Sequence, residues 1–352
     1  MLIIFLSEYR YILQLGAVVI YDLVIGQLFM NLPCATMLLI SFNQEAFIEL
    51  ALQGAVNQDY GNLEIIVSDD ASSDLTYSKI QTFASNYNGP HKIVINSNEK
   101  NIGIGANLSK AVSLSSGEMF FITAGDDISI SSRVSVVMDF WVKNNREADL
   151  IASNLFDMLQ DGSIVSEINL SDLSRYKSMD DWVKSPPNIR GAAQAWTRRL
   201  FDRFNGIPNG VVGEDMLMTF RAIALSRAIS LPVSLVYYRR GGLTSKTKAL
   251  SANYIISALK RKNESTQIEM QTLIKDALSL GAEANVISFF KAKLAREVYV
   301  KNIFNSKNKF GLFLSAHDVD FGFRCRIFMY AFSPWVTAPL FFVKKLKYRA
   351  IQ

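Results

Sequence analysis

Short apolar runs alternate with longer amphipathic segments in the first half of this 352-residue chain, and this alternation limits the possible folds more than any other feature. The apolar runs predict strands at Thr36–Phe42, Leu63–Val67, Lys92–Ile95 and Met119–Thr123. The segments between them predict helices at Glu45–Gln58, from Ser73 or Asp74 to about Tyr87, and at Ala106–Ser115. This order favours an α/β fold with right-handed βαβ units and a mainly parallel sheet flanked by helices. In such sheets, ligands bind at the carboxyl ends of the strands.

Pairs of acidic residues follow two of the predicted strands. Asp69 and Asp70 come at the end of the second strand, and Asp126 and Asp127 follow the fourth. Carboxylates gathered at one sheet edge are unfavourable unless a cation or hydrogen-bond donors neutralise them. Oxygen ligands suit Mg²⁺ or Mn²⁺, and Mg²⁺ usually takes few carboxylates together with substrate phosphates. Each pair alone could simply turn the chain, but two pairs after successive strands favour a divalent cation site.

A third acidic pair, Glu214-Asp215, follows Gly213 and precedes a helix that we predict from Met216. Acidic residues at a helix start can simply complement the helix dipole. In a chain that already has a cation-type pocket, the pair is also a candidate general base.

Several chemistries that other enzymes use are not expected. The Gly-x-Gly of Asn101–Asn107 lacks the third glycine of a dinucleotide site, so its glycines should permit a tight turn or the close approach of a ligand. His91 and His317 are the only histidines and lie far apart, which argues against zinc and Ser-His-Asp sites. Cys34 and Cys325, the only cysteines, form no disulfide framework and favour a reducing cytosol.

Beyond residue 149 the pattern is less regular. We expect strands at Leu150–Asn154, Gly191–Trp196 and Ser230–Tyr238, a turn at Asp161-Gly162, and helices at Asp180–Lys184 and Met216–Ser226. From Thr244 to about Ser288 the sequence is typical of helix, and a helical basic region follows it.

The chain therefore divides into an apolar extension (1–33), an α/β domain (34–245) and a helical basic region (246–352). The extension is interrupted by charges, so it lacks the ~20 clean apolar residues of a spanning helix. It is either a helix lying on a membrane or sequence upstream of a true start at Met30 or Met37. From Lys291 onward there are 12 Lys/Arg against 3 Asp/Glu. Aromatic residues interleave with these charges, which favours the inner face of a membrane over a nucleic acid as the partner.

Several segments together resemble the family 2 inverting glycosyltransferases, which have the GT-A fold. They are Ser41-Phe42-Asn43, Gln58-Asp59-Tyr60, Ser68–Asp74 (SDDASSD), Asn98–Asn107 (NEKNIGIGAN), Phe120–Asp127 (FFITAGDD), Gly213-Glu214-Asp215 and Tyr237–Gly242 (YYRRGG). The match covers roughly residues 36–245. The combination is specific, although each piece alone is not.

The resemblance implies transfer of a sugar, with inversion, from a nucleotide diphosphate sugar to a hydroxyl acceptor. The acceptor would be a saccharide or a lipid-linked saccharide in cell-surface polysaccharide synthesis. Asp69 would bind the nucleobase and Asp70 would lie near the ribose. The resemblance also assigns the donor side the residues Ser41, Asn43, Asn101, Gly103 and Asn107.

On the reacting side, the resemblance implies that Asp126 binds Mg²⁺ or Mn²⁺ and that Asp127 supports the sugar or the metal. Asp215 would be the catalytic base, with Glu214 as the next candidate. The chain departs from the family pattern at Ala124, where many members have an aspartate. Metal binding would then depend on Asp126 and the diphosphate.

Two other functions remain open at this point. The chain could be a nucleotide-sugar-binding module without catalysis, or a non-catalytic partner in a polysaccharide export complex, although such a module would not need Asp215. A nucleotidyltransferase can share a related sheet. A nucleotidyltransferase would need a Gly-rich loop bearing Arg or Lys after the first strand. This chain has Asn43-Gln44-Glu45-Ala46 there, which argues against that function.

Overall fold

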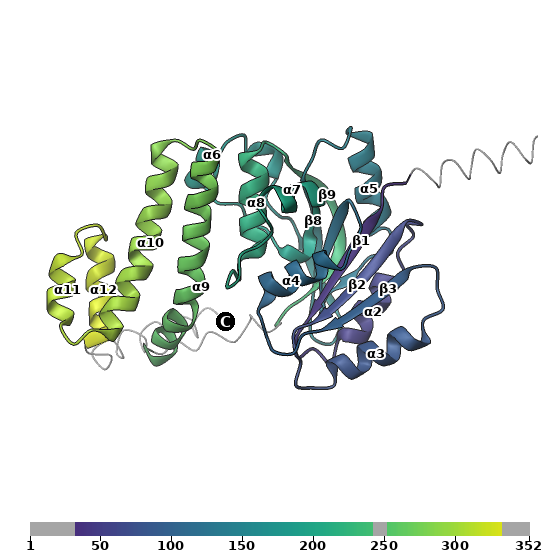
Figure 1. The fold of residues 1–352 in the computed structure, drawn as a ribbon, viewed down its shortest axis with the longest axis horizontal. Coiled ribbons are helices and arrows are strands. Elements are labelled where there is room, and N and C mark those ends of the chain that lie inside the picture. The colour runs from purple at the N-terminus through teal and green to yellow at the C-terminus, as the bar shows by residue number, and fades with distance from the viewer. Residues whose placement is uncertain (1–31, 242–251, 333–352) are drawn as a thin grey trace, which may run out of the picture.

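The computed structural model describes residues 32–241 and 252–332 (Figure 1). Three predicted features lie outside the described residues. They are the membrane-lying helix or upstream sequence within residues 1–31, the boundary near residue 245, and the last part of the basic region (333–352).

Four parallel strands form one half of the sheet. β1 (Ala35–Ser41) lies between β2 (Leu63–Asp69) and β4 (Met119–Ala124), and β3 (Lys92–Ser97) pairs with β2. The helices between them are α2 (Ile48–Val56), α3 (Thr76–Asn86) and α4 (Ile104–Ser113). These elements confirm the predicted alternation of strands and helices, with ends shifted by a few residues. Since Ser41 lies opposite Asp69, and Asp69 opposite Ser97, the three strands end at one edge.

The other half of the sheet is mixed. Over the described residues the strand order is β3-β2-β1-β4-β8-β6-β9-β5, with β7 paired to β6. β6 (Leu150–Met158) runs parallel to β9 (Ala228–Arg239), whereas β8 (Gln194–Thr197) is antiparallel to both β4 and β6. β7 (Ile164–Ile168) forms a hairpin with β6 through the predicted Asp161-Gly162 turn, where Gly162 has a φ of 89°. β5 (Ile128–Ser129) pairs with β9 beside the second acidic pair.

Short helices connect these strands. They are α5 (Arg133–Lys143), α6 (Met179–Lys184), α7 (Arg198–Arg203) and α8 (Glu214–Ala224), with single 3-10 turns at Leu173–Arg175 and Gly191–Ala193. Local sequence patterns do not predict α5, α7, β5 or β7. They predict a strand over Gly191–Trp196, of which only the second half is strand, because residues 191–193 form the 3-10 turn.

Alternate residues of the central strands face two apolar layers, as the two-residue period of a strand requires. Met37 and Leu39 of β1 pack in the layer that includes α2 and α5. Leu38 and Ile40 pack in the opposite layer, which includes α4, α8 and the next two helices of the chain. Both faces of the sheet are therefore covered, and its carboxyl edge is left for a site.

The C-terminal helices lie beyond α8 (Figure 1). α9 (Ala252–Ser279) and α10 (Ala284–Asn305) form a hairpin, and the break falls at Gly281, whose φ is 69°. The buried Arg221 of α8 pairs with Asp276 of α9 (Nε–Oδ2 2.7 Å), which joins the hairpin to the sheet domain.

α11 (Lys309–Ser315) and α12 (Phe321–Phe332) pack against α10 at the end farthest from the sheet (Figure 1). Within residues 32–241 and 252–332, no helix is long and apolar enough to cross a membrane. Cys34 and Cys325 are both free thiols.

Candidate functional site

The carboxylate of Asp69 is fully buried at the end of β2. Its Oδ1 accepts hydrogen bonds from Ser41 Oγ (3.0 Å) and Ser72 Oγ (2.5 Å), and its Oδ2 accepts one from Ser72 N (2.8 Å). Asp69 therefore joins the end of β1 to the loop after β2. Its expected contact with a nucleobase stays a prediction, and protein donors already occupy both of its oxygens.

Asp70 fixes the loop that leads into α4. Its Oδ1 accepts from Asn98 Nδ2 and Ile102 N, and its Oδ2 accepts from Gly103 N, all at 2.9 Å. Gly103 has a φ of 85°, which only glycine adopts readily, and α4 begins at the next residue. The conformation of the Gly-x-Gly segment thus depends on Asp70.

The remaining donor-side residues differ in exposure. Asn107 is fully buried, and its Nδ2 donates to Ser68 O (3.0 Å). Asn101 is exposed beside Gly103. Asn43, with a φ of 51°, donates its N–H to Ser72 Oγ (2.9 Å) and so ties the loop after β1 to the loop after β2. The structure brings all seven predicted donor-side residues to the carboxyl ends of β1–β3 and the start of α4.

Asp126 and Asp127 lie in the turn between β4 and β5. Asp127 is buried, and its Oδ1 accepts a hydrogen bond from Arg239 N (2.9 Å). Burial and then the charge of Asp126 raise the pKa of Asp127 to about 8, against the opposing charges of Arg133 and Arg239. Burial also raises the pKa of the half-buried Asp126, opposed by Arg239 and by a hydrogen bond with the Gln44 side chain.

Arg239 organises this turn, and the sequence analysis gave it no role of its own. Its Nε donates to Asp126 O (3.0 Å), and its Nη1 donates to Leu159 O (3.0 Å) and Gln160 O (2.9 Å). The guanidinium stacks over the Phe47 ring at 4.3 Å. Its buried Nη2 has no hydrogen-bond partner within the described part of the chain. An unpaired buried donor next to the Asp126 turn is suited to an anionic ligand.

The residues at this turn fit a cation that arrives with its substrate better than a preformed metal cage. Among residues 32–241 and 252–332, no group of three or more His, Cys, Asp or Glu residues is placed to hold a metal. Since Asp127 Oδ1 is engaged by Arg239 N, the half-buried Asp126 is the better placed ligand. Mg²⁺ commonly takes one or two carboxylates and completes its shell with phosphate oxygens and water.

The third acidic pair forms the first turn of α8. Asp215 Oδ1 accepts a hydrogen bond from Met216 N (2.7 Å). Burial raises the pKa of Asp215, while the N–H of Met216 and the positive charge of Arg190 oppose the rise. Glu214 is more deeply buried, and burial, together with the negative charges of Asp215 and Glu269, raises its pKa to about 8. The two adjacent acids therefore have different environments, because the positive charge of Arg190 opposes the rise in the pKa of Asp215.

Tyr238 is influenced by acids from both groups, those after β4 and those at the start of α8. It packs against an apolar cluster that includes Ala192 and Ala193 of the 3-10 turn. The preceding Gly191 lies beside Asp215, since a Cβ added at Gly191 would be 3.4 Å from Asp215 Cβ. Burial and the nearby charges of Asp127, Asp126 and Asp215 raise the pKa of the Tyr238 phenol. Tyr238 therefore lies within electrostatic range of the acids after β4 and of Asp215 at the start of α8.

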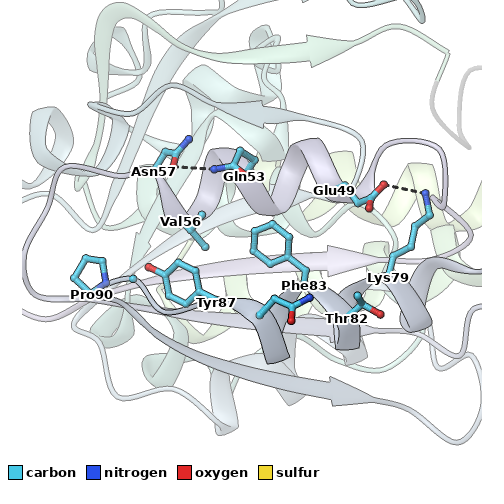
Figure 2. A pocket seen from close by; sticks show the side chains of 11 residues that line it. Glu49, Gln53, Val56, Asn57, Lys79, Thr82, Phe83, Tyr87 and Pro90 are labelled. Carbon is cyan, nitrogen blue, oxygen red and sulfur yellow. Dashed lines mark hydrogen bonds and ion pairs between the residues drawn. The ribbon is translucent and has the colours of Figure 1, made fainter.

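A surface groove of about 460 Å³ lies elsewhere, between α2 and α3 (Figure 2). Gln53 and Phe83 are among its lining residues, and Lys79 Nζ pairs with Glu49 Oε2 (3.0 Å) across it. None of the predicted acidic residues lines this groove, so it is separate from the site at the strand ends.

The sequence analysis missed the basic residues of the site. Arg190, Arg239 and the fully buried Arg133 supply its positive charge. Arg239 fell within the segment quoted for the family resemblance, so a signal was available for it. Arg133 and Arg190 occur in no pattern that distinguishes them from surface arginines.

Comparisons with known proteins agree with this geometry. The model of the glycosyl transferase family 2 matches residues 36–157. The GalNAc(5)-diNAcBac-PP-undecaprenol beta-1,3-glucosyltransferase of Campylobacter jejuni is 34% identical over 107 residues, which cover 30% of this chain and 34% of that protein. Abequosyltransferase RfbV of Salmonella typhimurium is 33% identical over 102 residues, covering 28% and 30%. The chain spans about a third to a half of the length of the first curated relatives that it matches.

The fold is also found among solved structures. The crystal structure of S. aureus TarS 1-349 has a TM-score of 0.52 at 15% identity, covering 86% of this chain and 80% of that one. The same TarS fragment in complex with UDP-GlcNAc has a TM-score of 0.51 at 14% identity, covering 84% and 90%. The match to the glycosyl transferase family 2 thus covers the parallel half of the sheet, and the likeness to these solved structures shows that the chain has a GT-A-type fold.

Proposed function

We propose that this chain transfers a sugar from a nucleotide diphosphate sugar to a hydroxyl acceptor, with inversion at the anomeric carbon. The observation that carries the proposal is the meeting of two acid groups at one place. The charges of Asp126 and Asp127, after β4, and of Asp215, at the start of α8, all act on Tyr238. The acids after β4 are suited to stabilising the diphosphate leaving group, and the acids at the start of α8 are suited to activating the attacking hydroxyl.

On the leaving side, the diphosphate must be neutralised as the bond to the sugar breaks. Asp126 would hold a divalent cation, Mg²⁺ or Mn²⁺, together with the diphosphate oxygens. When bound, the cation acts as a Lewis acid on the departing phosphate. Arg239 supports this arrangement because it fixes Asp126 O and Asp127, and one of its buried nitrogens finds no hydrogen-bond partner among the described residues. Asp127 would keep the turn in place through its hydrogen bond from Arg239 N.

On the attacking side, a sugar hydroxyl has a high pKa, so a carboxylate must accept its proton during the attack. Asp215 is suited to this role because Met216 N and the charge of Arg190 stabilise its ionised form. Glu214, whose pKa is raised to about 8, is mostly protonated at neutral pH. A single base opposite the leaving group favours direct displacement, which inverts the anomeric centre.

The nature of the acceptor rests on the relatives. The matched Campylobacter protein is named for a saccharide linked to undecaprenol through diphosphate, and the matched Salmonella protein is named as an abequosyltransferase. Both names support a saccharide or lipid-linked saccharide acceptor in cell-surface polysaccharide synthesis as our proposal for this chain.

A lipid-linked acceptor would require the enzyme to work at a membrane surface, and we propose that α11 and α12 provide the contact. Their exposed apolar side chains include Phe310 (63% exposed), Phe321 (63%) and Phe332 (67%). Exposed Arg326 and half-buried Lys309 lie in the same two helices. Amphipathic helices with aromatic and basic residues lie in the interface of anionic membranes. We therefore propose that the enzyme acts at the cytoplasmic face of the membrane.

Co-sedimentation with anionic vesicles tests the membrane contact. The variant Phe310→Ser/Phe321→Ser should remain in the supernatant at low salt, whereas the wild-type chain sediments. The control variant Leu75→Ser/Leu278→Ser removes two equally exposed apolar side chains (62% and 59%) from other surfaces. If the α11–α12 variant sediments as the control does, these helices do not bind the membrane.

A panel of nucleotide sugars tests the main proposal. The chain should be protected against thermal unfolding by one of them, more strongly with Mn²⁺ present, because a ligand that binds only the folded state stabilises it. Release of the nucleoside diphosphate on addition of a saccharide acceptor then separates an enzyme from the alternative, a non-catalytic nucleotide-sugar-binding module or export partner. Protection without any turnover would favour the binding module. No protection by any donor would refute both.

A further inference from the structure

The loop from Gly206 to Gly213 leads directly into the acidic pair at the start of α8. On one side it packs against α4, the helix that begins at the donor-side glycines. A Cβ added at Gly105 would lie 2.8 Å from Val211 O and 2.8 Å from Ile207 Cγ2, so only glycine permits this contact. Ser109 Oγ also donates to Ile207 O (3.3 Å). The loop therefore contacts α4, on the donor side of the site, before the chain reaches Asp215, the proposed base.

On its other side the same loop is held by α9, which lies outside the part of the chain that the family model matches. Glu269 Oε1 accepts hydrogen bonds from Val212 N (3.0 Å) and Gly213 N (2.7 Å). Gly210 has a φ of 86°, and a Cβ added there would lie 2.5 Å from Ile268 Cδ1. Two neighbouring residues of α9 thus contact three of the last four residues before Glu214, namely Gly210, Val212 and Gly213.

Glu269 binds the backbone at the start of α8, where the N-cap residue makes no side-chain hydrogen bond to the helix. Helices leave their first N–H groups without partners inside the helix, and an adjacent side chain usually binds them. Gly213, at the N-cap of α8, has no side chain to do so. The Glu269 carboxylate binds the N–H groups of Val212 and Gly213 instead, and its negative charge complements the helix N-terminus.

We propose that Glu269 is a positioning residue that fixes the start of α8, so that Asp215 stays aligned with the acceptor hydroxyl. This inference rests on the proposed transferase function, and it gives the C-terminal helical region a part in the reaction. Asp215 follows Gly213 by two residues, so a shift of the Val212–Gly213 backbone moves the base. Displacement of a catalytic group by about 1 Å can lower a rate by about 100-fold.

Three full-length variants test the inference. Glu269→Ala removes the acceptor, Glu269→Gln keeps an acceptor oxygen without the charge, and Glu264→Ala removes an exposed acid from the same helix as a control. We expect Glu269→Ala to lower kcat about 10- to 100-fold, with the dissociation constant for UDP unchanged. Amide exchange at Val212 and Gly213 should speed up in the same variant. Glu269→Gln should restore most of kcat and of the protection against exchange, and Glu264→Ala should behave as wild type.

Each other outcome opposes the inference. Turnover by Glu269→Ala equal to that of Glu264→Ala would overturn it, as would a Gln variant as slow as the Ala variant, which would indicate a charge effect. If UDP affinity falls in parallel with kcat, the role is structural. If the wild-type chain releases UDP from neither UDP-glucose nor UDP-GlcNAc, the amide-exchange rates alone test whether Glu269 anchors the start of α8. Faster exchange in Glu269→Ala, with rescue by Gln, then supports the anchor even if the transferase proposal fails.

Discussion

Adjacent acids in the first turn of α8 should respond to very different degrees when each is replaced by its amide. Asp215→Asn should nearly abolish transfer, whereas Glu214→Gln should lower it only moderately. The reason is the environment of each acid. Met216 N and the charge of Arg190 favour the ionised form of Asp215, while deep burial keeps Glu214 neutral up to about pH 8. Gln therefore replaces Glu214 with a neutral group of the same shape, and Asn removes the proton acceptor.

The magnitude follows from the chemistry that each substitution removes. Loss of a general base typically costs 10²- to 10⁴-fold in rate, which corresponds to about 3–5 kcal/mol of transition-state free energy. The Asn side chain keeps an oxygen that can accept from Met216 N at the position of Asp215 Oδ1 (2.7 Å), so the helix start should be preserved. We expect Asp215→Asn to lower kcat by at least ~10²-fold. For Glu214→Gln we expect about 10-fold or less, since only the packing of a neutral group changes.

Initial rates of nucleoside diphosphate release, measured with a saturating donor over a range of pH, distinguish the two acids. In the wild-type chain the rate should fall at low pH as Asp215 becomes protonated. The midpoint should lie above the ordinary aspartate range of about 4, because burial raises its pKa. Donor affinity should be unchanged in both variants. A near-normal rate in Asp215→Asn together with a large loss in Glu214→Gln would refute the assignment and make Glu214 the base.

Three further predictions concern the donor side and stability. Asp126→Ala should abolish the Mn²⁺-dependent part of UDP affinity in calorimetry, and unchanged metal dependence would exclude Asp126 as the ligand. Asp70→Ala should weaken UDP binding and speed amide exchange at Gly103, because its carboxylate holds that N–H. Glu214→Gln should stabilise the fold against urea at pH 7 by roughly 2–4 kcal/mol, since one unit of pKa shift is worth about 1.4 kcal/mol. The folded-state pKa of Glu214 is raised, so wild-type stability is intact below about pH 4 and falls as pH rises toward 8; the gain should vanish near pH 4.

The parallel half of the fold could be predicted from sequence because local patterns determine it. The runs that form β1 and β2 are apolar on both faces, since both faces of the sheet are covered, and such runs stand out against amphipathic helices. The mixed half was harder. β5 has two residues and depends on pairing with β9, more than a hundred residues later in the chain. α5 was not predicted, although its buried face packs on the sheet as those of the other helices do.

For the candidate site, the sequence predicted the acids but not the groups that contact them and shift their pKa values. Asp126 and Asp127 come directly after an apolar strand, which is a local signal. Arg239 reaches the same turn only because β9 pairs with β5. Glu269 has no local signal either, because it reaches the loop before α8 across the packing of two helices. Contacts between distant segments of the chain set the pKa and the position of the acids, and periodicity does not encode such contacts.

The burial of Glu214 favours an enzyme over a module that only holds a nucleotide sugar. A buried acid with no cation partner opposes folding at neutral pH, and the charges that act on Glu214 are the carboxylates of Asp215 and Glu269. A binding module needs only the contacts at the strand ends and gains nothing from this arrangement. A transferase does gain, because a neutral Glu214 leaves Asp215 as the single anion of the pair, with Arg190 favouring its ionised form. In the proposed reaction, the unfavourable environment of Glu214 would keep Asp215 ready to accept the proton of the acceptor hydroxyl.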